Sequence, residues 1–354
     1  MASAPPALRF SPVRVLGLCG VFLLLLVGAV LFAVRFGEQP VSLTAVFTDA
    51  TSSDATIFWS VRLPRVLLAA LVGAGLAASG STLQGVLRNP LADPFVLGVS
   101  GGAALGATVS IALGLSTVGQ VVPGSGVWLE QLSAPAFFAF VGAVGSILFV
   151  LGASRGHGRY APISALLIGV IFNAFASAVI TLIKVISDPH KVKDLLHFLT
   201  GSLTFEPPGT LAFFAVLQAV AIGVMLALSG RLNLLTLGDE DAASLGVPVA
   251  RTRRVLLLAT SASVAGAVVI SGLIGFVGLI VPHVLRLVFG PDQRLLVPLS
   301  AVGGALFLVL ADLLARLAYP LFNQELPVGS VTALLGGPLF LALLYRRGRL
   351  ALGL

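Results

Sequence analysis

Long runs of apolar residues, separated by short polar segments, extend along most of the chain. A helix that crosses a bilayer needs about 20 mostly apolar residues. By that criterion the pattern predicts ten spans, at residues 13–34, 64–86, 94–114, 134–152, 162–184, 210–229, 255–272, 274–289, 295–318 and 328–345. The first run is longer than the apolar core of a signal peptide, so we expect a retained span. The predicted fold class is an all-α polytopic membrane protein.

The composition excludes an ordinary soluble protein. The 354 residues are 57% hydrophobic and 10% charged, whereas soluble domains contain about 25% charged residues. The net charge of +7 does not indicate a nucleic-acid partner, because basic residues in membrane proteins gather in cytoplasmic loops. The single cysteine, Cys19, lies in an apolar run and excludes an intrachain disulfide.

The distribution of basic residues predicts the orientation. With the N-terminus inside, fourteen arginines fall in cytoplasmic segments: Arg9, Arg14, Arg88, Arg155, Arg159, Arg231, Arg251, Arg253, Arg254, Arg286, Arg294, Arg346, Arg347 and Arg349. Seven basic residues fall on the other side: Arg35, Arg62, Arg65, Lys184, Lys191, Lys193 and Arg316. Cytoplasmic loops carry the excess of basic residues, so we expect both termini in the cytoplasm, as an even number of spans also requires.

The longest polar passage of the second half is Arg231–Arg254, between the sixth and seventh spans. Three acids follow Gly238, and a glycine and a proline come a few residues later, which is typical of a short helix with a negative N-terminal turn. Leu237 and Leu245 would give such a helix an apolar face. From these residues alone, a docking element and an ordinary solvated loop are equally good interpretations.

The stretch Gln84–Gly106 interrupts the apolar pattern. Pro90 and Pro94 forbid a continuous helix there, and Asn89 and Asp93 are suited to cap a new one. Polar, broken backbone at membrane depth must be buried in protein or line a water-filled path. As a generic pattern, this break between the second and third spans is interpreted as a loop without a function.

This stretch also resembles the signature of the FecCD-like permeases, the membrane subunits of type II ABC importers for ferric siderophores, haem and cobalamin. The resemblance continues in order through residues 60 to 345. It is carried by Arg62-Leu-Pro-Arg65, Leu237-Gly-Asp-Glu-Asp-Ala-Ala-Ser-Leu-Gly246, Gly275-Phe-Val-Gly-Leu-Ile-Val-Pro-His283-Val-Leu-Arg286, Ala311-Asp312 and Glu325-Leu-Pro-Val-Gly329.

The resemblance implies the type II importer permease fold as a single transmembrane domain over residues 1–354, with a cytoplasmic tail at 1–12 and a coupling segment at 231–254. It implies a homodimer in the bacterial cell membrane, two separate ABC ATPase subunits that bind ATP and Mg²⁺, and a periplasmic or lipid-anchored binding protein. The expected cargo is a ferric siderophore or haem, with cobalamin as the alternative. No cofactor is expected in this chain.

The resemblance also implies residue roles. The coupling element that docks on the ATPase corresponds to Leu237, Gly238, Asp239, Glu240, Asp241, Leu245 and Gly246. Three arginines at outer ends of spans, Arg62, Arg65 and Arg316, match positions that receive acidic residues of the binding protein. The alternative for them is interfacial snorkelling, or for Arg316 an i, i+4 pair with Asp312.

A polar stripe on the fifth span is a candidate pathway. Asn173, Ser177 and Thr181 recur every four residues, and such a stripe faces either another helix or a path. In the resembled family this span lines the channel, which favours the pathway. Asn89 and Leu91 match positions that close the channel on the inner side.

The sequence lacks the residues that several other functions need. The only lysines are Lys184, Lys191 and Lys193, and none follows a glycine, so the chain has no phosphate-binding P-loop. The four histidines have no metal-ligand spacing, and we expect no metal site. An ion-coupled secondary transporter is a remote alternative, because Asp312 is nearly the only acid within a predicted span and Arg316 can neutralise it.

Overall fold

The computed structural model describes residues 11–36, 42–49, 52–122, 133–154, 161–203 and 208–352. Seven helices in these ranges are long and apolar enough to cross a membrane, and three shorter apolar helices accompany them. The regular elements of the described ranges are all helical, apart from an isolated bridge between Thr117 and Ser133. The all-α polytopic prediction is confirmed.

Each predicted span overlaps one main helix of the structure, but the span predicted at 94–114 is divided at Gly98 into a 3₁₀ helix and an α-helix. The main helices are α1 (Pro12–Arg35), α4 (Leu63–Val86), α5 (Val99–Ala112), α7 (Ala134–Ser154), α8 (Ala161–Ile186), α10 (Pro208–Ala227), α13 (Val249–Ser271), α14 (Val277–Phe289), α15 (Gln293–Leu317) and α17 (Val328–Leu352). Short elements connect them: α2 (Leu43–Thr48), α3 (Ser53–Thr56), η1 (Ile57–Arg62), η2 (Pro94–Leu97), η3 (Val118–Gln120), α9 (Pro189–Thr200), α11 (Ser229–Leu237), α12 (Asp239–Ser244) and α16 (Tyr319–Phe322).

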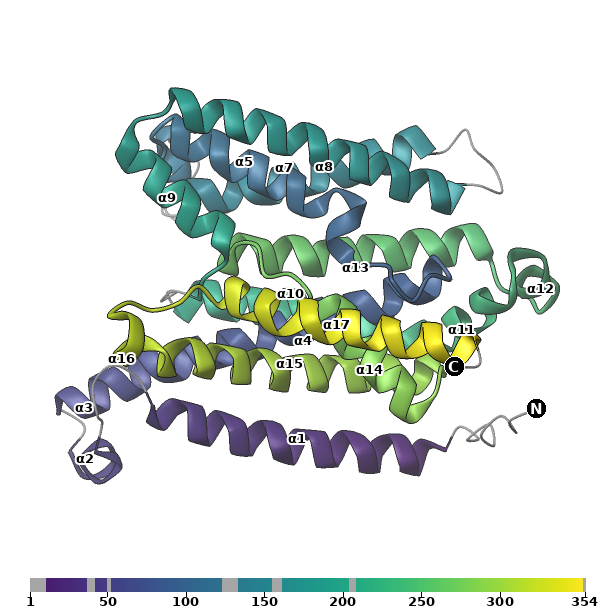
Figure 1. The fold of residues 1–354 in the computed structure, drawn as a ribbon, viewed down its shortest axis with the longest axis horizontal. Helices are drawn as coiled ribbons and strands as arrows, with labels where there is room; N and C mark the ends of the chain where they lie inside the picture. The colour runs from purple at the N-terminus through teal and green to yellow at the C-terminus, as the bar shows by residue number, and fades with distance from the viewer. Residues whose placement is uncertain are drawn as a thin grey trace.

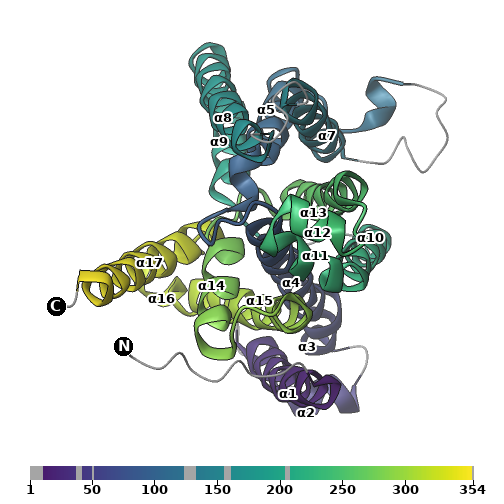
Figure 2. The same ribbon diagram turned by 90° about the vertical axis from the view of Figure 1, so that its right-hand side faces the viewer.

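Helix α4 lies at the centre of the main bundle, where α10, α13, α14 and α15 contact it (Figure 2). It is buried along most of its length. Small residues permit this packing, since a Cβ added to Gly73 would lie 2.2 Å from the carbonyl oxygen of Gly304 on α15. Close backbone approach replaces the hydrophobic driving force that a lipid environment does not supply.

Helices α5, α7 and α8 form a separate layer that meets the main bundle mainly through α13 (Figure 2). Helix α1 packs on α15 at the opposite edge. On α8, the side chains of Leu167, Ile171 and Phe175 are exposed, and Leu334 and Leu341 are exposed on α17. Two helices of the single chain therefore present apolar faces to lipid or to another protein.

The start of α1, the end of α17 and the short helix α12 lie at the same end of the molecule (Figure 1). This arrangement agrees with an even number of crossings. The assignment of that end to the cytoplasm still rests on the basic residues and stays a prediction.

Some helices extend beyond their apolar runs, among them α17, which continues to Leu352. Helix α13 begins at Val249 rather than at residue 255, so Arg251, Arg253 and Arg254 lie in its first two turns and not in a loop. Before α4, the chain is already helical from Ser53 through η1. Apolar periodicity marks the part of a helix that crosses the bilayer, whereas arginine is a good helix former that continues it into water.

Candidate functional site

The polar segment between α10 and α13 folds as two helices with a sharp turn between them. Helix α11 ends at Leu237, Gly238 adopts φ +145°, and α12 follows with Asp239, Glu240 and Asp241 in its first turn. The acids thus occupy the positive end of a helix, as predicted. The prediction of one helix with Leu237 and Leu245 on its face is wrong, because Leu237 belongs to α11 and Leu245 is the C-cap of α12.

Helix α12 ends in a Schellman motif. The N–H of Val247 donates to the carbonyl of Ala242 at 3.0 Å, and the N–H of Gly246 donates to that of Ala243 at 2.9 Å. Gly246 supplies the left-handed conformation that this motif needs, with φ +81°. The buried side chains of Ala242 and Val247 hold the turn against the bundle.

Two leucines stand out on this element because they face solvent. The side chains of Leu237 and Leu245 are 62% and 58% exposed, although α12 itself is anchored. Isolated exposed leucines are common, but a pair that flanks a rigid turn at a polar end of a membrane protein is suited to a partner surface.

Asp239 joins three parts of the chain. Its Oδ1 accepts hydrogen bonds from Arg88, which follows α4, and from Arg253 on α13, the latter at 2.8 Å. Arg88 also donates from Nε to the carbonyl of Leu235 at 2.8 Å. The head of α12 is therefore tied to the segment that leads into the broken stretch after α4.

The pKa of Asp239 reflects these contacts. Partial burial by itself would raise the pKa, but the guanidinium groups of Arg253 and Arg88 outweigh burial and lower it below the ordinary value. The ion pairs are therefore present at neutral pH and are lost only as the pH falls below the ordinary carboxyl range.

Helix α11 is fixed from its other side by the start of α15. Asn233 donates from Nδ2 to Asp292 at 2.6 Å, and its Oδ1 accepts the backbone N–H of Gln293 at 2.7 Å. Burial alone would raise the pKa of Asp292, but hydrogen bonds from Arg294 and Asn233 lower it. Together with Arg88, these bonds make α11 and α12 a rigid extension of the bundle.

Of the two caps predicted for the break after α4, Asp93 is the N-cap of a helix, whereas Asn89 caps only a turn. Helix α4 ends at Val86, and η2 begins at Pro94. Between them, Asn89 accepts the N–H of Leu91 at 3.0 Å, and Asp93 accepts that of Phe95 at 2.7 Å. Leu91 is 43% exposed, and the closure of a channel by Asn89 and Leu91 stays a prediction.

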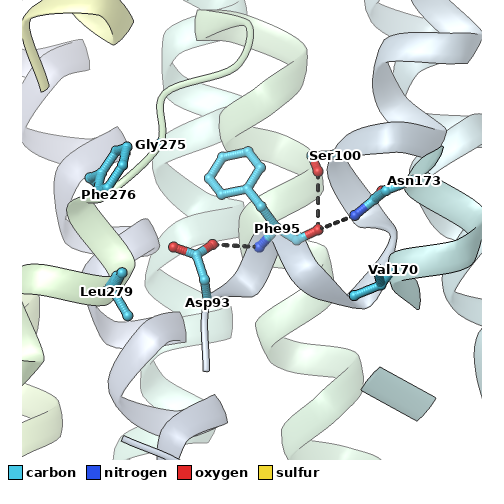
Figure 3. A pocket seen from close by; sticks show the side chains of 8 residues that line it. All are labelled: Asp93, Phe95, Ser100, Val170, Asn173, Gly275, Phe276 and Leu279. Atoms are coloured by element: carbon cyan, nitrogen blue, oxygen red, sulfur yellow. Dashed lines mark hydrogen bonds between the residues drawn. The ribbon is translucent and has the colours of Figure 1, made fainter. Parts of the chain in front are cut away.

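Asn173 on α8 holds the break in place (Figure 3). Its Nδ2 donates to the carbonyl of Phe95 at 2.8 Å, and its Oδ1 accepts the N–H of Gly101 at 3.1 Å. The hydroxyl of Ser100 donates to the same Phe95 carbonyl at 3.1 Å. The amide of Asn173 thus satisfies backbone groups on both sides of the turn into α5.

A cavity of about 380 Å³ lies where two breaks in the helices meet (Figure 3). The first break contributes Asp93, Phe95 and Ser100, and the connection into α14 contributes Gly275, Phe276 and Leu279. Asn173 and Val170 close it from α8. Near this second break, Gln84 donates to the carbonyls of Gly278 and Leu279, at 3.4 and 3.3 Å.

The other two residues of the predicted stripe differ from Asn173. Ser177 and Thr181 are exposed on α8, and the Thr181 hydroxyl donates to the Ser177 carbonyl at 2.9 Å. The structure therefore splits the stripe: its first member packs within the chain, and the next two lie on the surface of the single copy.

The three outer arginines all have partners within the chain. Arg62 donates to the carbonyl of Arg35 at 2.9 Å, and Arg316 donates to those of Ala33 and Phe36 at 3.0 and 2.8 Å. These bonds add partners to carbonyl groups at the C-terminal end of α1, where helical donors run out. Arg62 and Arg316 are only 6% and 5% exposed.

Arg65 and Arg316 share the carboxylate of Asp312, each at 3.0 Å. Arg65 also contacts both oxygens of Glu325, at 3.0 and 2.7 Å. The i, i+4 pair between Asp312 and Arg316 is confirmed. Docking of a partner by these arginines stays a prediction, and their internal contacts give a second reason for their presence.

Arg88, Arg253 and Gln84 are functional candidates that sequence reasoning missed. The two arginines were counted only as markers of orientation. Arg88 has φ +51°, a backbone conformation that no local pattern announces for arginine. Its bond to Asp239 spans 151 residues. Only a three-dimensional structure, or a pairing pattern among relatives, could have found it.

Within the described ranges, no group of three or more His, Cys, Asp or Glu side chains is placed to hold a metal ion. His197 instead contacts the hydroxyl of Ser202, at 3.0 Å.

The sequence model described as the FecCD transport family matches residues 23–346. The hemin transport permease HmuU of Yersinia pestis is 41% identical over 93% of this chain and 95% of its own length. The vitamin B12 import permease BtuC of Vibrio cholerae is 39% identical over 85% and 86%, and the molybdate import permease MolB of Haemophilus influenzae is 37% identical over 83% and 82%.

A solved structure shows the same fold. It is a metal-chelate type ABC transporter in an inward-facing conformation, with a TM-score of 0.80 and 33% identity. The match covers 95% of this chain and all of that one.

Because Asn173 makes two hydrogen bonds to the break, we predict that its replacement lowers the stability of the chain more than replacement of its polar neighbour Ser177. Replacing Asn173 by alanine leaves a backbone donor and part of an acceptor unsatisfied at the break, at a cost of about 1–2 kcal/mol. Ser177→Ala, one turn away on the exposed surface, should cost much less. Thermal unfolding in detergent measures both. Equal midpoints for the two variants would contradict the role of Asn173 as a clamp.

Proposed function

The chain belongs to the FecCD transport family, and on that premise we propose that it carries a metal chelate across the cell membrane for an ATP-driven importer. The permeases of this family are not themselves ATPases, so the chemical energy comes from a separate subunit. The proposed assembly is a homodimer of this chain with two ATPase subunits and a substrate-binding protein.

The observation that carries the proposal is the tie between α12 and the broken stretch after α4. Asp239 connects α12 through Arg88 to the residues just before Asn89 and Leu91. The exposed side chains of Leu237 and Leu245 lie beside that tie. If a partner binds these leucines and then changes position, it would displace the break as well.

The mechanism follows from this connection. ATP binding closes the two ATPase subunits, and their clefts move α11 and α12, which are one rigid unit with the start of α15. Arg88 passes the movement to Asn89 and Leu91, which open or close the inner end of the path. The Asn173 clamp transmits the displacement of η2 to α8.

The path itself is proposed to run between two copies of the chain. Ser177 and Thr181 are exposed on α8, and large apolar side chains are exposed on α8 and α17. A second copy would bury much of this apolar surface and enclose the two hydroxyl side chains. Asn173 is a positioning residue beside the path in this proposal.

The binding protein is proposed to dock near Arg62, Arg65 and Arg316. Of these, Arg65 is the most accessible to a partner, with 16% of its side chain exposed. The buried Arg62 and Arg316 would act indirectly, by holding the end of α1 beside Arg65.

The cargo is proposed to be a ferric siderophore or haem. The similarity to a hemin permease over nearly the whole chain supports this choice, and the similarity to a vitamin B12 permease keeps cobalamin as the alternative. A proton-coupled carrier is a weaker candidate, because the one buried carboxylate within α15, Asp312, is paired with two arginines.

Reconstitution tests the proposed function. Liposomes that contain this chain, its ATPase and its binding protein should accumulate ferric siderophore or haem only when ATP is available to the ATPase. A proton gradient should neither replace ATP nor change the initial rate. Uptake by the chain alone under a proton gradient would contradict an ATP-driven importer and favour a secondary carrier.

Leu245 should matter more than the acids that face solvent beside it. Burial of this leucine in a cleft of the ATPase would contribute roughly 1.5–3 kcal/mol. Leu245→Asp should therefore strip the ATPase from the purified complex and abolish uptake. Asp241→Asn is the control, because an exposed acid contributes at most about 1 kcal/mol to a contact. If the Leu245→Asp complex stays assembled and transports normally, α12 does not seat in the ATPase.

We predict that loss of the Asp239 carboxylate lowers the coupling of uptake to ATP hydrolysis without releasing the ATPase. Asp239→Asn weakens the ties to Arg88 and Arg253 without touching Leu237 or Leu245. The ATPase should co-purify normally, but ligand uptake per ATP hydrolysed should fall roughly fivefold, as about 1 kcal/mol of lost coupling implies. Asp241→Asn carries the same charge change and should keep the ratio. An unchanged ratio in Asp239→Asn would remove Arg88 from the transmission path.

A further inference from the structure

A second cavity of about 380 Å³ lies away from the proposed path, where α10 ends and α13 begins. It is lined by Leu228, Arg231, Pro248, Arg251, Thr252 and Val255. Arg231 belongs to the first turn of α11, and Arg251 and Thr252 belong to the first turn of α13. None of these residues takes part in the coupling contacts described above.

The two arginines of this cavity are uncompensated. Arg231 and Arg251 have no hydrogen-bond or ion-pair partner among the described residues, and no acidic side chain lines the cavity. Arg253, two residues after Arg251, is instead paired with Asp239, and so is Arg88. Both side chains are exposed, so they are free to bind an anion at the cavity, and guanidinium forks match phosphate geometry.

Two further features of the cavity favour an anion. Thr252 is only 2% exposed, and its Oγ1 has no hydrogen-bond partner within the described chain. The N-terminal turn of α13 begins at Val249 without a side-chain cap, so its first backbone N–H groups lack helical acceptors. A helix N-terminus with free donors attracts phosphate groups.

The position of the cavity and its apolar lining favour a lipid, rather than a free ion, as the source of the phosphate. Helix α10 exposes Phe213, Val216 and Val220 and, next to the cavity, Leu226, and Figure 2 places the helix on the side of the bundle away from α17. The cavity thus lies at the predicted inner membrane surface, on a lipid-facing edge. Leu228 and Val255 supply an apolar wall beside the charged groups.

We propose that this cavity binds the phosphate headgroup of an anionic membrane lipid. Arg231 and Arg251 hold the phosphate oxygens, the hydroxyl of Thr252 donates to one of them, and the acyl chains lie along α10. Basic pockets between spans on the cytoplasmic side are general sites for such headgroups. The bound lipid would join the ends of α10 and α13, the two helices that flank the coupling segment.

Thermal unfolding of the full chain in detergent tests the site. Added phosphatidylglycerol should raise the midpoint by roughly 2–4 °C relative to the same amount of phosphatidylcholine, because a ligand that binds the folded state stabilises it. Inorganic phosphate should not reproduce the rise, since it lacks the acyl chains. An equal rise with inorganic phosphate would assign the cavity to a free ion and overturn the lipid proposal.

Single substitutions test whether the rise in the unfolding midpoint depends on this cavity. Arg251→Gln should lose the rise, whereas Arg254→Gln should keep it, because Arg254 is exposed on the same helix but does not line the cavity. Thr252→Val should reduce the rise without lowering the midpoint in phosphatidylcholine, since its hydroxyl has no other partner. The same rise in Arg251→Gln and Arg254→Gln would contradict the site.

The remaining alternative is that the arginines receive acids of the ATPase. In that case an Arg231→Gln, Arg251→Gln double variant would keep the phosphatidylglycerol rise but lose the ATPase on co-purification, and the lipid proposal would be wrong. Normal co-purification together with a lost lipid effect supports the proposal. The proposed transport function does not depend on either outcome.

Discussion

A membrane interior offers no water to an open backbone, and this constraint governs the segment between α4 and α5. The chain breaks its helix there at Pro90 and Pro94, so every exposed backbone group needs a partner from the protein. Asp93 and Ser100 supply partners from within the break, and Asn173 supplies two from another helix. Because a side chain from another helix bonds the backbone groups of the break, we expect the break and that helix to move together. A break held in this way is suited to transmit motion.

The same segment is tied at its other end to the polar surface of the molecule. Arg88 precedes the break and contacts both the carboxylate of Asp239 and the carbonyl of Leu235. Asn233 then fixes α11 to the start of α15. A rigid connection therefore runs from the exposed leucines on either side of α12, through one carboxylate, to Asn89 and Leu91. The opposite end of the bundle uses the same principle, since Arg62 and Arg316 satisfy the carbonyl groups at the end of α1.

Sequence alone predicted where the main helices lie, the break and the short helix with acids in its first turn, because each depends on local pattern: apolar length, proline, and charges at a helix end. It could not predict that Arg88 meets Asp239, or that Asn173 serves the break, because these pairs are separated by 151 and 78 residues. It also placed Leu237 and Leu245 on one helix, whereas Gly238 turns the chain between them. The burial of Arg62 and Arg316 could not be predicted either, because the position of a residue at the end of a span does not show which elements pack against its side chain.

The central claim is that α12 and the loop after α4 move as one body. Spin labels at Leu91 and Ser244, in a chain whose Cys19 is replaced by serine, report the distance between them within one copy of the assembled importer. The account predicts that this distance stays the same between the nucleotide-free and ATP-bound states, while the distance between the two copies at Leu91 changes. A change in the distance from Leu91 to Ser244 as large as the change between copies would contradict it.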